Sequence, residues 1–153
     1  MAESPVPTKY SVYGYKYITP PNIVLCEEGT LTAYAGDLVK FDSSGQLAIA
    51  TSGAINGISQ KTFTGTTGAI IPVELIAREN LYVMRAASGT TTDQANVGEQ
   101  GDITFTVNGG HYVTANTTSG ADVQIMALHP EDGEKLGGRY IVRFMEGALD
   151  FSV

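Results

Sequence analysis

The expected fold follows first from residues 36–50, Gly36-Asp37-Leu38-Val39-Lys40-Phe41-Asp42-Ser43-Ser44-Gly45-Gln46-Leu47-Ala48-Ile49-Ala50. Two short apolar segments flank the polar tetrapeptide 42–45. Aspartate and serine are common turn residues, and Gly45 can adopt the positive φ that a tight turn often requires. The stretch therefore predicts a β-hairpin with strands near 37–42 and 46–50.

A second hairpin is predicted further along the chain, where Asn108-Gly109-Gly110 separates a strand near 102–107 from one near 111–115. Its first residues, Gly101-Asp102-Ile103, repeat the pattern Gly36-Asp37-Leu38, and the spacing to a later glycine and alanine is equal in both hairpins. Two interpretations stay open. The chain contains two duplicated halves of one β-barrel, or these are features that any two β-hairpins share.

Short apolar segments, separated by turn-forming residues, recur along the rest of the chain. Strands are predicted near residues 22–26, 30–34, 37–42, 46–50, 55–59, 69–77, 80–86, 102–107, 111–115, 123–128 and 139–145. One helical turn is predicted at 92–97, with Thr91 or Thr92 as its N-cap and Gly98 as its stop. We expect an all-β fold, a small β-barrel or β-sandwich of short antiparallel strands, with at most one short helical turn.

Composition narrows the range of partners. The chain has 153 residues, enough for one domain with its own core. Only 16% of its residues are charged, so we expect a surface that is neutral and rich in hydroxyl groups, or partly covered. The net charge of −7 argues against nucleic acid and anionic membranes as partners. The N-terminal residues 1–7 lack the pattern of a signal peptide, which predicts a soluble protein made in a cytoplasm.

Residues 1–21 differ from the expected β-domain, residues 22–153, and predict an extended N-terminal arm. They contain four of the eight tyrosines, and their prolines and Gly14 disfavour a helix. The arm is either a first strand whose tyrosines cover the barrel or a docking segment, since tyrosine is enriched at protein interfaces. The docking interpretation predicts that a partner or subunit interface contains Lys9, Tyr10, Tyr13, Tyr15, Lys16 and Tyr17.

Patterns that carry catalysis or bind metals are sparse. His111 and His129 have no partner at metal-ligand spacing. Cys26 cannot form an internal disulfide, and the two glutamates after it disfavour a thiolate, so it is expected to be a buried apolar residue. Neither a serine-nucleophile elbow nor a phosphate-binding glycine loop occurs. We therefore expect no catalytic residues, no metal, no cofactor and no enzymatic activity.

Two groups of acidic residues have structural explanations. Asp37 and Asp102 each follow a glycine and precede a predicted strand, which is typical of turn residues that accept backbone N–H groups. The segment 131–134, Glu-Asp-Gly-Glu, lacks the alternating pattern of a calcium loop. It is expected to be a solvated loop, with a weak cation site as the alternative.

The order of turns and strands resembles the β-barrel domain of tailed-bacteriophage head decoration, or cement, proteins over about residues 30–145. The resemblance is carried by the segments 35–39 and 55–59 in the first half and by 91–98, 101–105, 110–113, 122–125 and 138–144 in the second. It implies a non-enzymatic virion protein, made in the host cytoplasm, on the outer capsid surface. It also implies contacts with the major capsid protein, bridging of capsomers, and a homo-oligomer, with a trimer favoured.

Other classes remain as alternatives. A phage tail-tube or fibre-associated β-domain has the same strand-rich, acidic composition. A trimeric β-barrel enzyme of nucleotide metabolism has a similar length, but its water-activating aspartate motif and phosphate-binding segment do not occur. A carbohydrate-binding module is weakened by the absence of tryptophan.

Overall fold

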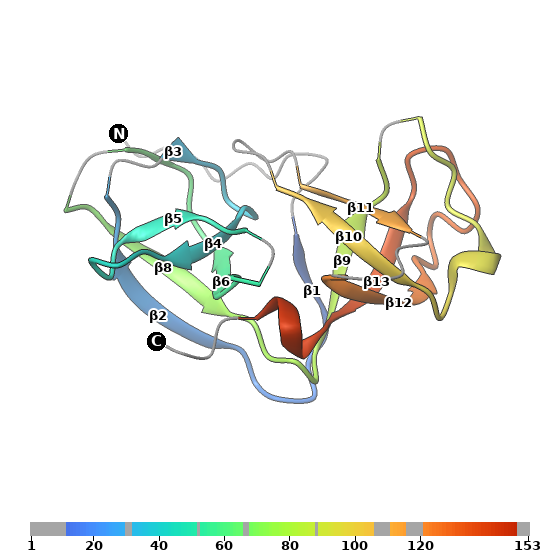
Figure 1. Ribbon diagram of the computed structural model, residues 1–153, viewed down its shortest axis with the longest axis horizontal. Helices are drawn as coiled ribbons and strands as arrows, with labels where there is room; N and C mark the ends of the chain where they lie inside the picture. Colours follow the sequence, from blue (N-terminus) through green and yellow to red (C-terminus); the bar gives the residue numbers. More distant parts are fainter. Residues whose placement is uncertain are drawn as a thin grey trace.

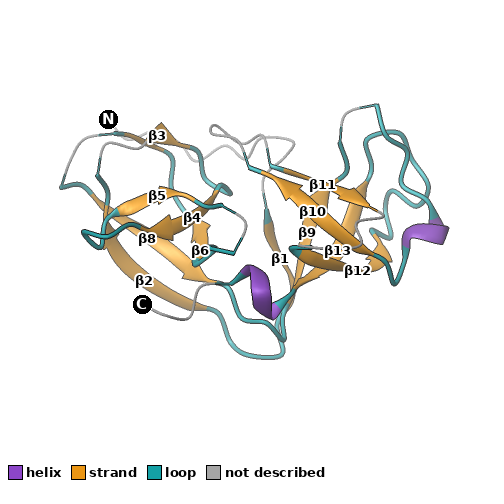
Figure 2. Ribbon diagram, in the orientation of Figure 1, coloured by secondary structure: helices purple, strands orange, loops and turns teal. Residues whose placement is uncertain are grey.

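The protein folds into two antiparallel sheets that face each other across a shared core. The computed structural model describes residues 12–29, 32–51, 53–65, 68–87, 89–105, 111–115 and 121–149. The sheets are not closed into a barrel and form a β-sandwich, so the predicted all-β class is confirmed. Figure 1 shows the two larger sheets side by side, with β1 between them. Figure 2 shows how little of the described chain is helical.

Each sheet draws most of its strands from one half of the chain. The six-stranded sheet has the order β1 (Tyr13–Lys16), β9 (Leu81–Arg85), β13 (Arg139–Phe144), β12 (Val123–Leu128), β10 (Gln100–Thr104) and β11 (Tyr112–Ala115). The five-stranded sheet has the order β2 (Asn22–Glu27), β8 (Ile70–Leu75), β6 (Gly57–Ser59), β4 (Leu38–Phe41) and β5 (Leu47–Ile49). A small third sheet pairs β3 (Thr32–Ala33) with β7 (Phe63–Thr64). The strand β1 is thus the exception, because it crosses from the N-terminus to the sheet of the second half.

Every predicted strand overlaps an observed one, and the differences lie in the shortest elements. The strand β7 was not predicted. β1 lies in the predicted N-terminal arm, where a first strand was one of the two alternatives, and it pairs with β9. The helical turn is a 3-10 turn, η1 (Gln94–Asn96), and its N-cap is Asp93, whose carboxylate accepts from the amide of Ala95. The predicted caps Thr91 and Thr92 are therefore wrong. A second 3-10 turn, η2 (Glu146–Ala148), exceeds the single turn that was expected.

Both predicted hairpins are formed. β4 and β5 pair across a turn in which Gly45 has a φ of 77° and Asp42 accepts from the amides of Ser44 and Gln46. β10 and β11 pair in the same way, and the turn residues 108–110 lie outside the described residues. The first strand of each hairpin also pairs with the strand that follows the hairpin in the chain, so β4 pairs with β6 and β10 pairs with β12. The internal duplication stays a prediction.

The main core lies between the two sheets because alternate residues of a strand face opposite sides. From the six-stranded sheet it receives Tyr82, Met84, Tyr140, Val142 and Phe144, and from the first half of the chain Leu38, Ile55, Ile58 and Ile76. The next residue after Leu38, Val39, points to the other face of the five-stranded sheet. There it joins a second cluster with Cys26, Leu47, Ile71 and Val73.

Backbone contacts also join the two halves of the chain. The amide of Val12 donates to the carbonyl of Gly36 at 3.0 Å, beside the first hairpin. The amide of Ile55 donates to the carbonyl of Ala148 at 3.2 Å, which returns the C-terminal segment to the first half. Val12, directly before β1, and the segment after β13 therefore both contact the half of the chain that forms the five-stranded sheet.

Candidate docking surface

The strand β1 and the residue that follows it, Tyr17, present tyrosines at an edge of the six-stranded sheet. Tyr13, Tyr15 and Tyr17 are between 40% and 45% exposed. The hydroxyl of Tyr13 accepts from Nη1 of Arg139 at 2.8 Å, and the ring of Tyr15 packs edge-on against His129 with ring centroids 5.9 Å apart. The rings are thus held in place while a large part of each remains available for contact.

The connection from β1 to β2 is fixed by a buried asparagine. Oδ1 of Asn80 accepts from the amides of Ile18 and Thr19, both at 2.8 Å, and its Nδ2 donates to the carbonyl of Thr19 at 2.9 Å. Asn80 itself is 1% exposed, between β8 and β9. This clamp leaves the side chain of Ile18 in solvent, so the exposed tyrosines continue into an exposed aliphatic residue.

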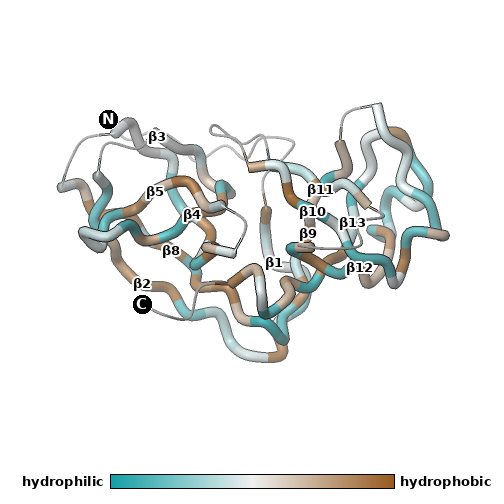
Figure 3. The backbone as a smooth tube through the Cα atoms, in the orientation of Figure 1, coloured by the Kyte–Doolittle hydropathy of each residue, from teal (hydrophilic) through white to brown (hydrophobic). Residues whose placement is uncertain are grey.

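An apolar face follows on β2 and β8. Ile23, Leu25 and Ile70 are each at least about half exposed, and Leu25 is 73% exposed. Ile23 lies opposite Glu74 and Leu25 opposite Pro72, so all of these side chains share one face of the antiparallel pair. Because β2 is the edge of its sheet, its outer backbone groups are not paired within it. The hydrophobic colour along β2 in Figure 3 follows the same strand.

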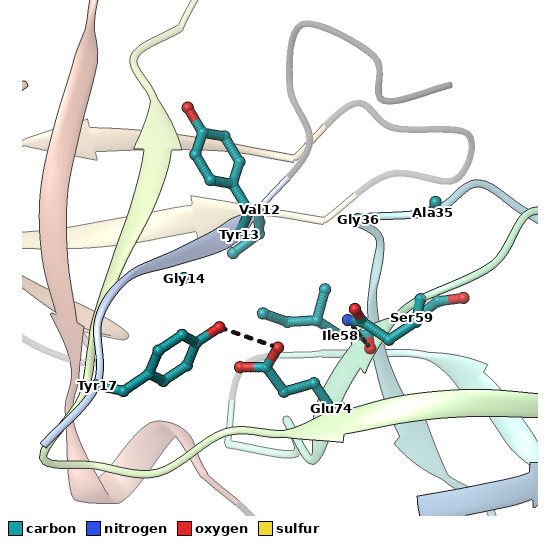
Figure 4. A pocket seen from close by; sticks show the side chains of 10 residues that line it. Val12, Tyr13, Gly14, Tyr17, Ala35, Gly36, Ile58, Ser59 and Glu74 are labelled. Atoms are coloured by element: carbon teal, nitrogen blue, oxygen red, sulfur yellow. Dashed lines mark hydrogen bonds between the residues drawn. The ribbon is translucent and has the colours of Figure 1, made fainter. Parts of the chain in front are cut away.

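Tyr17 joins these two exposed regions. Its hydroxyl donates to Oε1 of Glu74 at 3.1 Å, and the two side chains point toward each other in Figure 4. Glu74 shares its face with Ile23, so this contact brings Tyr17 to the apolar face of β2 and β8. We call these exposed side chains together the docking surface, which consists of Tyr13, Tyr15, Tyr17, Ile18, Ile23, Leu25 and Ile70.

A cavity of about 550 Å³ opens beside the Tyr17–Glu74 contact. Burial raises the pKa of Glu74, and the hydrogen bond from Tyr17 opposes that rise. Burial, together with the hydrogen bond to Glu74 and its charge, raises the pKa of Tyr17 to about 12. The phenol therefore stays protonated at neutral pH and acts as the donor. Oε2 of Glu74 is buried and has no hydrogen-bond partner among the described residues.

Part of the predicted interface falls on this surface. Tyr13, Tyr15 and Tyr17 belong to it, and Lys16 lies exposed between them. Lys9 and Tyr10 lie outside the described residues. Sequence reasoning did not single out the apolar residues of β2 and β8, or Glu74. The available signal was that Glu74 is the one charged residue inside the apolar segment 69–77.

Both histidines and the cysteine are buried. Nε2 of His111 accepts from the amide of Leu38 at 3.2 Å and lies 3.5 Å from Oδ1 of Asp37. His129 is also buried, and its Nδ1 accepts from a backbone amide. Cys26 is buried in the second core cluster, as predicted, and burial raises the pKa of its thiol. The described part of the chain contains no group of three or more side chains that could hold a metal ion.

The two predicted turn aspartates differ. Asp37 precedes β4 and accepts from the amide of Tyr34 at 3.0 Å, so its prediction is confirmed. The prediction for Asp102 is wrong, because β10 already begins at Gln100 and Asp102 lies within the strand. The amide of Ile103 is instead bound by Oδ2 of Asp122 at 2.9 Å.

The acidic segment 131–134 is held by neighbouring groups. Oδ2 of Asp132 accepts from both Nε and the backbone amide of Arg139, each at 2.8 Å. Glu134 accepts from the amide of Gln94 at the start of η1. Glu131 and Glu134 are exposed, whereas the side chain of Asp132 is only 5% exposed. The loop is therefore solvated at its glutamates and internally bound at its aspartate.

No protein-family model matches this chain, and the comparisons with curated proteins and with solved structures found no match either. Within the described ranges, no helix has the length and hydropathy needed to span a membrane. The docking surface therefore has to be interpreted from its own geometry.

Proposed function

We propose that this protein is a non-enzymatic structural protein of a phage virion, which binds the outer surface of the assembled capsid and stabilises it by bridging capsomers. The observation that carries the proposal is the docking surface, which combines exposed tyrosines on and directly after one edge strand with exposed aliphatic side chains on and beside another. Large apolar side chains that gather on the surface of a protein mark sites of protein interaction. The turn and strand pattern that resembles head decoration proteins supports the major capsid protein as the proposed partner.

The side chains of the docking surface are suited to binding an assembled capsid. Tyrosine and leucine bury large apolar area, and tyrosine does so at little cost in side-chain entropy. A homotrimer, which we propose as the oligomeric form, would present three such surfaces and gain avidity when it contacts several capsomers. A ligand that binds only the assembled shell also stabilises that shell by mass action.

Co-sedimentation with expanded, undecorated phage heads tests the proposal. We expect saturable binding of the wild-type protein at a fixed ratio to the major capsid protein, together with higher thermal survival of the shells. Leu25→Ser should weaken binding at least about tenfold, the loss expected for a well-buried interface residue. Leu136→Ser is the matched control, since Leu136 is similarly exposed, at 65%, but lies outside the docking surface.

Two outcomes would contradict the proposal. If the wild-type protein does not sediment with the heads at low or moderate salt, the capsid role fails and a tail or fibre role takes its place. If Leu25→Ser binds the heads as tightly as Leu136→Ser does, this surface is not the one that meets the capsid.

A further inference from the structure

The outer edge of β2 presents backbone groups that face away from its sheet. In the register of β2 on β8, Leu25 lies opposite Pro72, which has no N–H. The carbonyl of Pro72 accepts from the amide of Gln60, on the side of β6, at 2.9 Å. The Leu25–Pro72 pair therefore exchanges no backbone hydrogen bond. Because such pairs alternate along antiparallel strands, the N–H and C=O groups of Ile23 and Leu25 point outward.

This edge lacks the features that protect other sheet edges. β2 has six residues in an uninterrupted register with β8, and it contains neither lysine nor proline. By contrast, β1 contains Lys16 and has an irregular register on β9. β5 and β11 are shorter, and each takes part in a parallel bridge, Leu47 with Glu28 and Val113 with Ala86. Among the described strands, β2 is thus the edge most open to pairing with a further strand.

The second half of the chain shows what pairs with the equivalent edge there. The strand orders β2-β8-β6-β4-β5 and β9-β13-β12-β10-β11 match, because the first strand of each half pairs with the last. A parallel bridge follows the first strand in both halves, at Glu28 and at Ala86. Before that bridge, the outer edge of β9 pairs antiparallel with β1, which lies before both halves in the chain. The outer edge of β2 has no such strand in the part of the chain that the structure describes.

The sequence before β1 has the pattern of an added edge strand. In an extended chain, alternate residues direct their N–H groups to the same side. Pro5 and Pro7 are two positions apart, so the donors that they lack belong to one side. Val6 and Thr8 can donate from the other side. Such a segment can therefore pair along one side, as a strand at the edge of a sheet does.

The anchoring of Val12 favours a segment from a second copy of the chain. The amide of Val12 is bound to the carbonyl of Gly36, close to the start of β4. β6 and β8 lie between β4 and β2, so β2 is three strand spacings, about 14 Å, away. At about 3.3 Å per residue, crossing that distance within one copy would use residues 8–11 and withdraw Thr8 from pairing. In the single chain, moreover, Leu25 is 73% exposed.

We propose that residues 5–8 of one copy add to the outer edge of β2 in a second copy as an antiparallel strand. Val6 pairs with Leu25 and Thr8 pairs with Ile23, so the side chain of Val6 extends the apolar face of β2. Each copy gives one segment and receives another, and such a head-to-tail contact can close into a ring, such as the proposed homotrimer. The inference rests on that proposed homo-oligomer and not on the capsid role.

Two proline variants of the full-length protein test the pairing by sedimentation equilibrium. Thr8→Pro removes an N–H that donates to β2, so it should raise the Kd of self-association at least about tenfold. Lys9→Pro is the matched control, because the N–H of Lys9 lies on the same side as Pro5 and Pro7. It should change that Kd by less than about threefold. Both substitutions lie before β1, so neither alters a residue of the two larger sheets.

Amide hydrogen exchange, measured by NMR on the ¹⁵N-labelled protein, locates the contact. The amides of Ile23 and Leu25 should exchange at least about tenfold more slowly at high than at low protein concentration, because pairing between copies protects them. Thr8→Pro should abolish this dependence on concentration. The amides of Val24 and Cys26, which face β8, should be protected at every concentration.

Three results would overturn the proposal. The first is a wild-type protein that remains monomeric, and the second is a Thr8→Pro variant that associates as tightly as Lys9→Pro does. The third is exchange at Ile23 and Leu25 that does not depend on concentration. Slow exchange of these amides at every concentration would place the added strand within the same copy, and fast exchange would leave the edge unpaired.

Binding to phage heads separates this inference from the proposed function. If the copies associate through β2 but the wild-type protein does not bind heads, the contact between copies stands and the capsid role fails. If the protein binds heads while Ile23 and Leu25 show no protection that depends on concentration, the capsid role stands and the contact between copies is wrong. If both hold, Thr8→Pro should bind heads more weakly than Lys9→Pro, because a monomer lacks the avidity of the oligomer.

Discussion

At the scale of single residues, Arg139 joins β13 to two other parts of the chain. Its guanidinium contacts Asp132 and Glu131 in the acidic segment and the hydroxyl of Tyr13 on β1. The hydrogen bonds from Arg139 lower the pKa of Asp132 to about 2. Because that side chain is only 5% exposed, water screens the pair less than it would a surface ion pair.

Asp132→Asn should lower the free energy of unfolding at pH 7 by about 2 kcal/mol, which is the energy equivalent of the depressed pKa. Between about pH 2 and pH 4, the carboxyl group of Asp132 is mostly ionised in the folded protein but mostly protonated in the unfolded chain. Its contribution is therefore complete above about pH 4 and is lost as the pH falls toward 2. Urea unfolding at several pH values measures this. A loss that is equally large at pH 2 and pH 7 would contradict the electrostatic explanation.

Glu131→Gln is the control for this prediction. Glu131 contacts the same guanidinium at 3.2 Å, but its side chain is 77% exposed. Exposed ion pairs contribute little, so the change in the free energy of unfolding should stay within about 1 kcal/mol.

At the scale of elements, the five-stranded sheet depends on a close approach between β6 and β8. Gly57 lies opposite Leu75, and a Cβ atom on it would lie 2.6 Å from the carbonyl oxygen of Glu74 and 2.5 Å from Cγ1 of Val73. A side chain there can fit only if the backbone of β8 moves. The strand therefore needs glycine for close packing rather than for a turn.

Gly57→Ala should lower the free energy of unfolding by about 1–3 kcal/mol, the usual cost of overpacking. Gly147→Ala is the control, because a Cβ atom on Gly147 would meet no described atom within 4 Å and should change stability by less than about 0.5 kcal/mol. Urea unfolding of both variants provides the comparison. If the two variants were equally stable, the backbone of β8 could move to fit the new side chain without a loss in the free energy of unfolding.

At the scale of the whole molecule, the two sheets share one core. Phe144 on β13 is fully buried and packs edge-on against Tyr82, with ring centroids 5.4 Å apart. The same cluster contains Leu38 and Ile58 from the five-stranded sheet. Residues from both halves of the chain are thus buried against each other in one core. We therefore expect the two sheets to unfold together.

Phe144→Ala should lower the free energy of unfolding by about 3–5 kcal/mol, as for other large buried aromatic residues. Native-state hydrogen exchange should show faster exchange in β4 as well as in β13, since the loss affects the common core. Ile70→Ala, at an exposed site, should change neither strand by more than about 0.5 kcal/mol. If only the strands of the six-stranded sheet responded, the two halves would be independent units.

The strands and the first hairpin could be predicted because their signals are local. Apolar segments bounded by turn residues place β4 and β5, and Gly45 supplies the positive φ of the turn between them. The prediction failed where pairing with a distant segment decides the outcome. β7 is a two-residue strand that depends on β3, and Asp102 lies within β10 although Gly101 resembles a turn glycine.

The candidate site was predictable only in part for the same reason. The concentration of tyrosines in residues 1–21 indicated a surface for contact, and Tyr13, Tyr15 and Tyr17 are all exposed on it. The link from Tyr17 to the face that carries Ile23 and Leu25 cannot be read from the sequence, because it follows from the register of β2 on β8 and from the contact between Tyr17 and Glu74, 57 positions away.

By itself, the sequence determined the all-β class, the approximate positions of most strands and the first hairpin turn, since apolar alternation and turn residues act over a few neighbouring positions. Only the tertiary structure decided which strands became edges, which aliphatic side chains remained exposed, and that Glu74 would lie buried beside a cavity. Those properties depend on contacts between residues far apart in the chain, and local propensity carries no information about them.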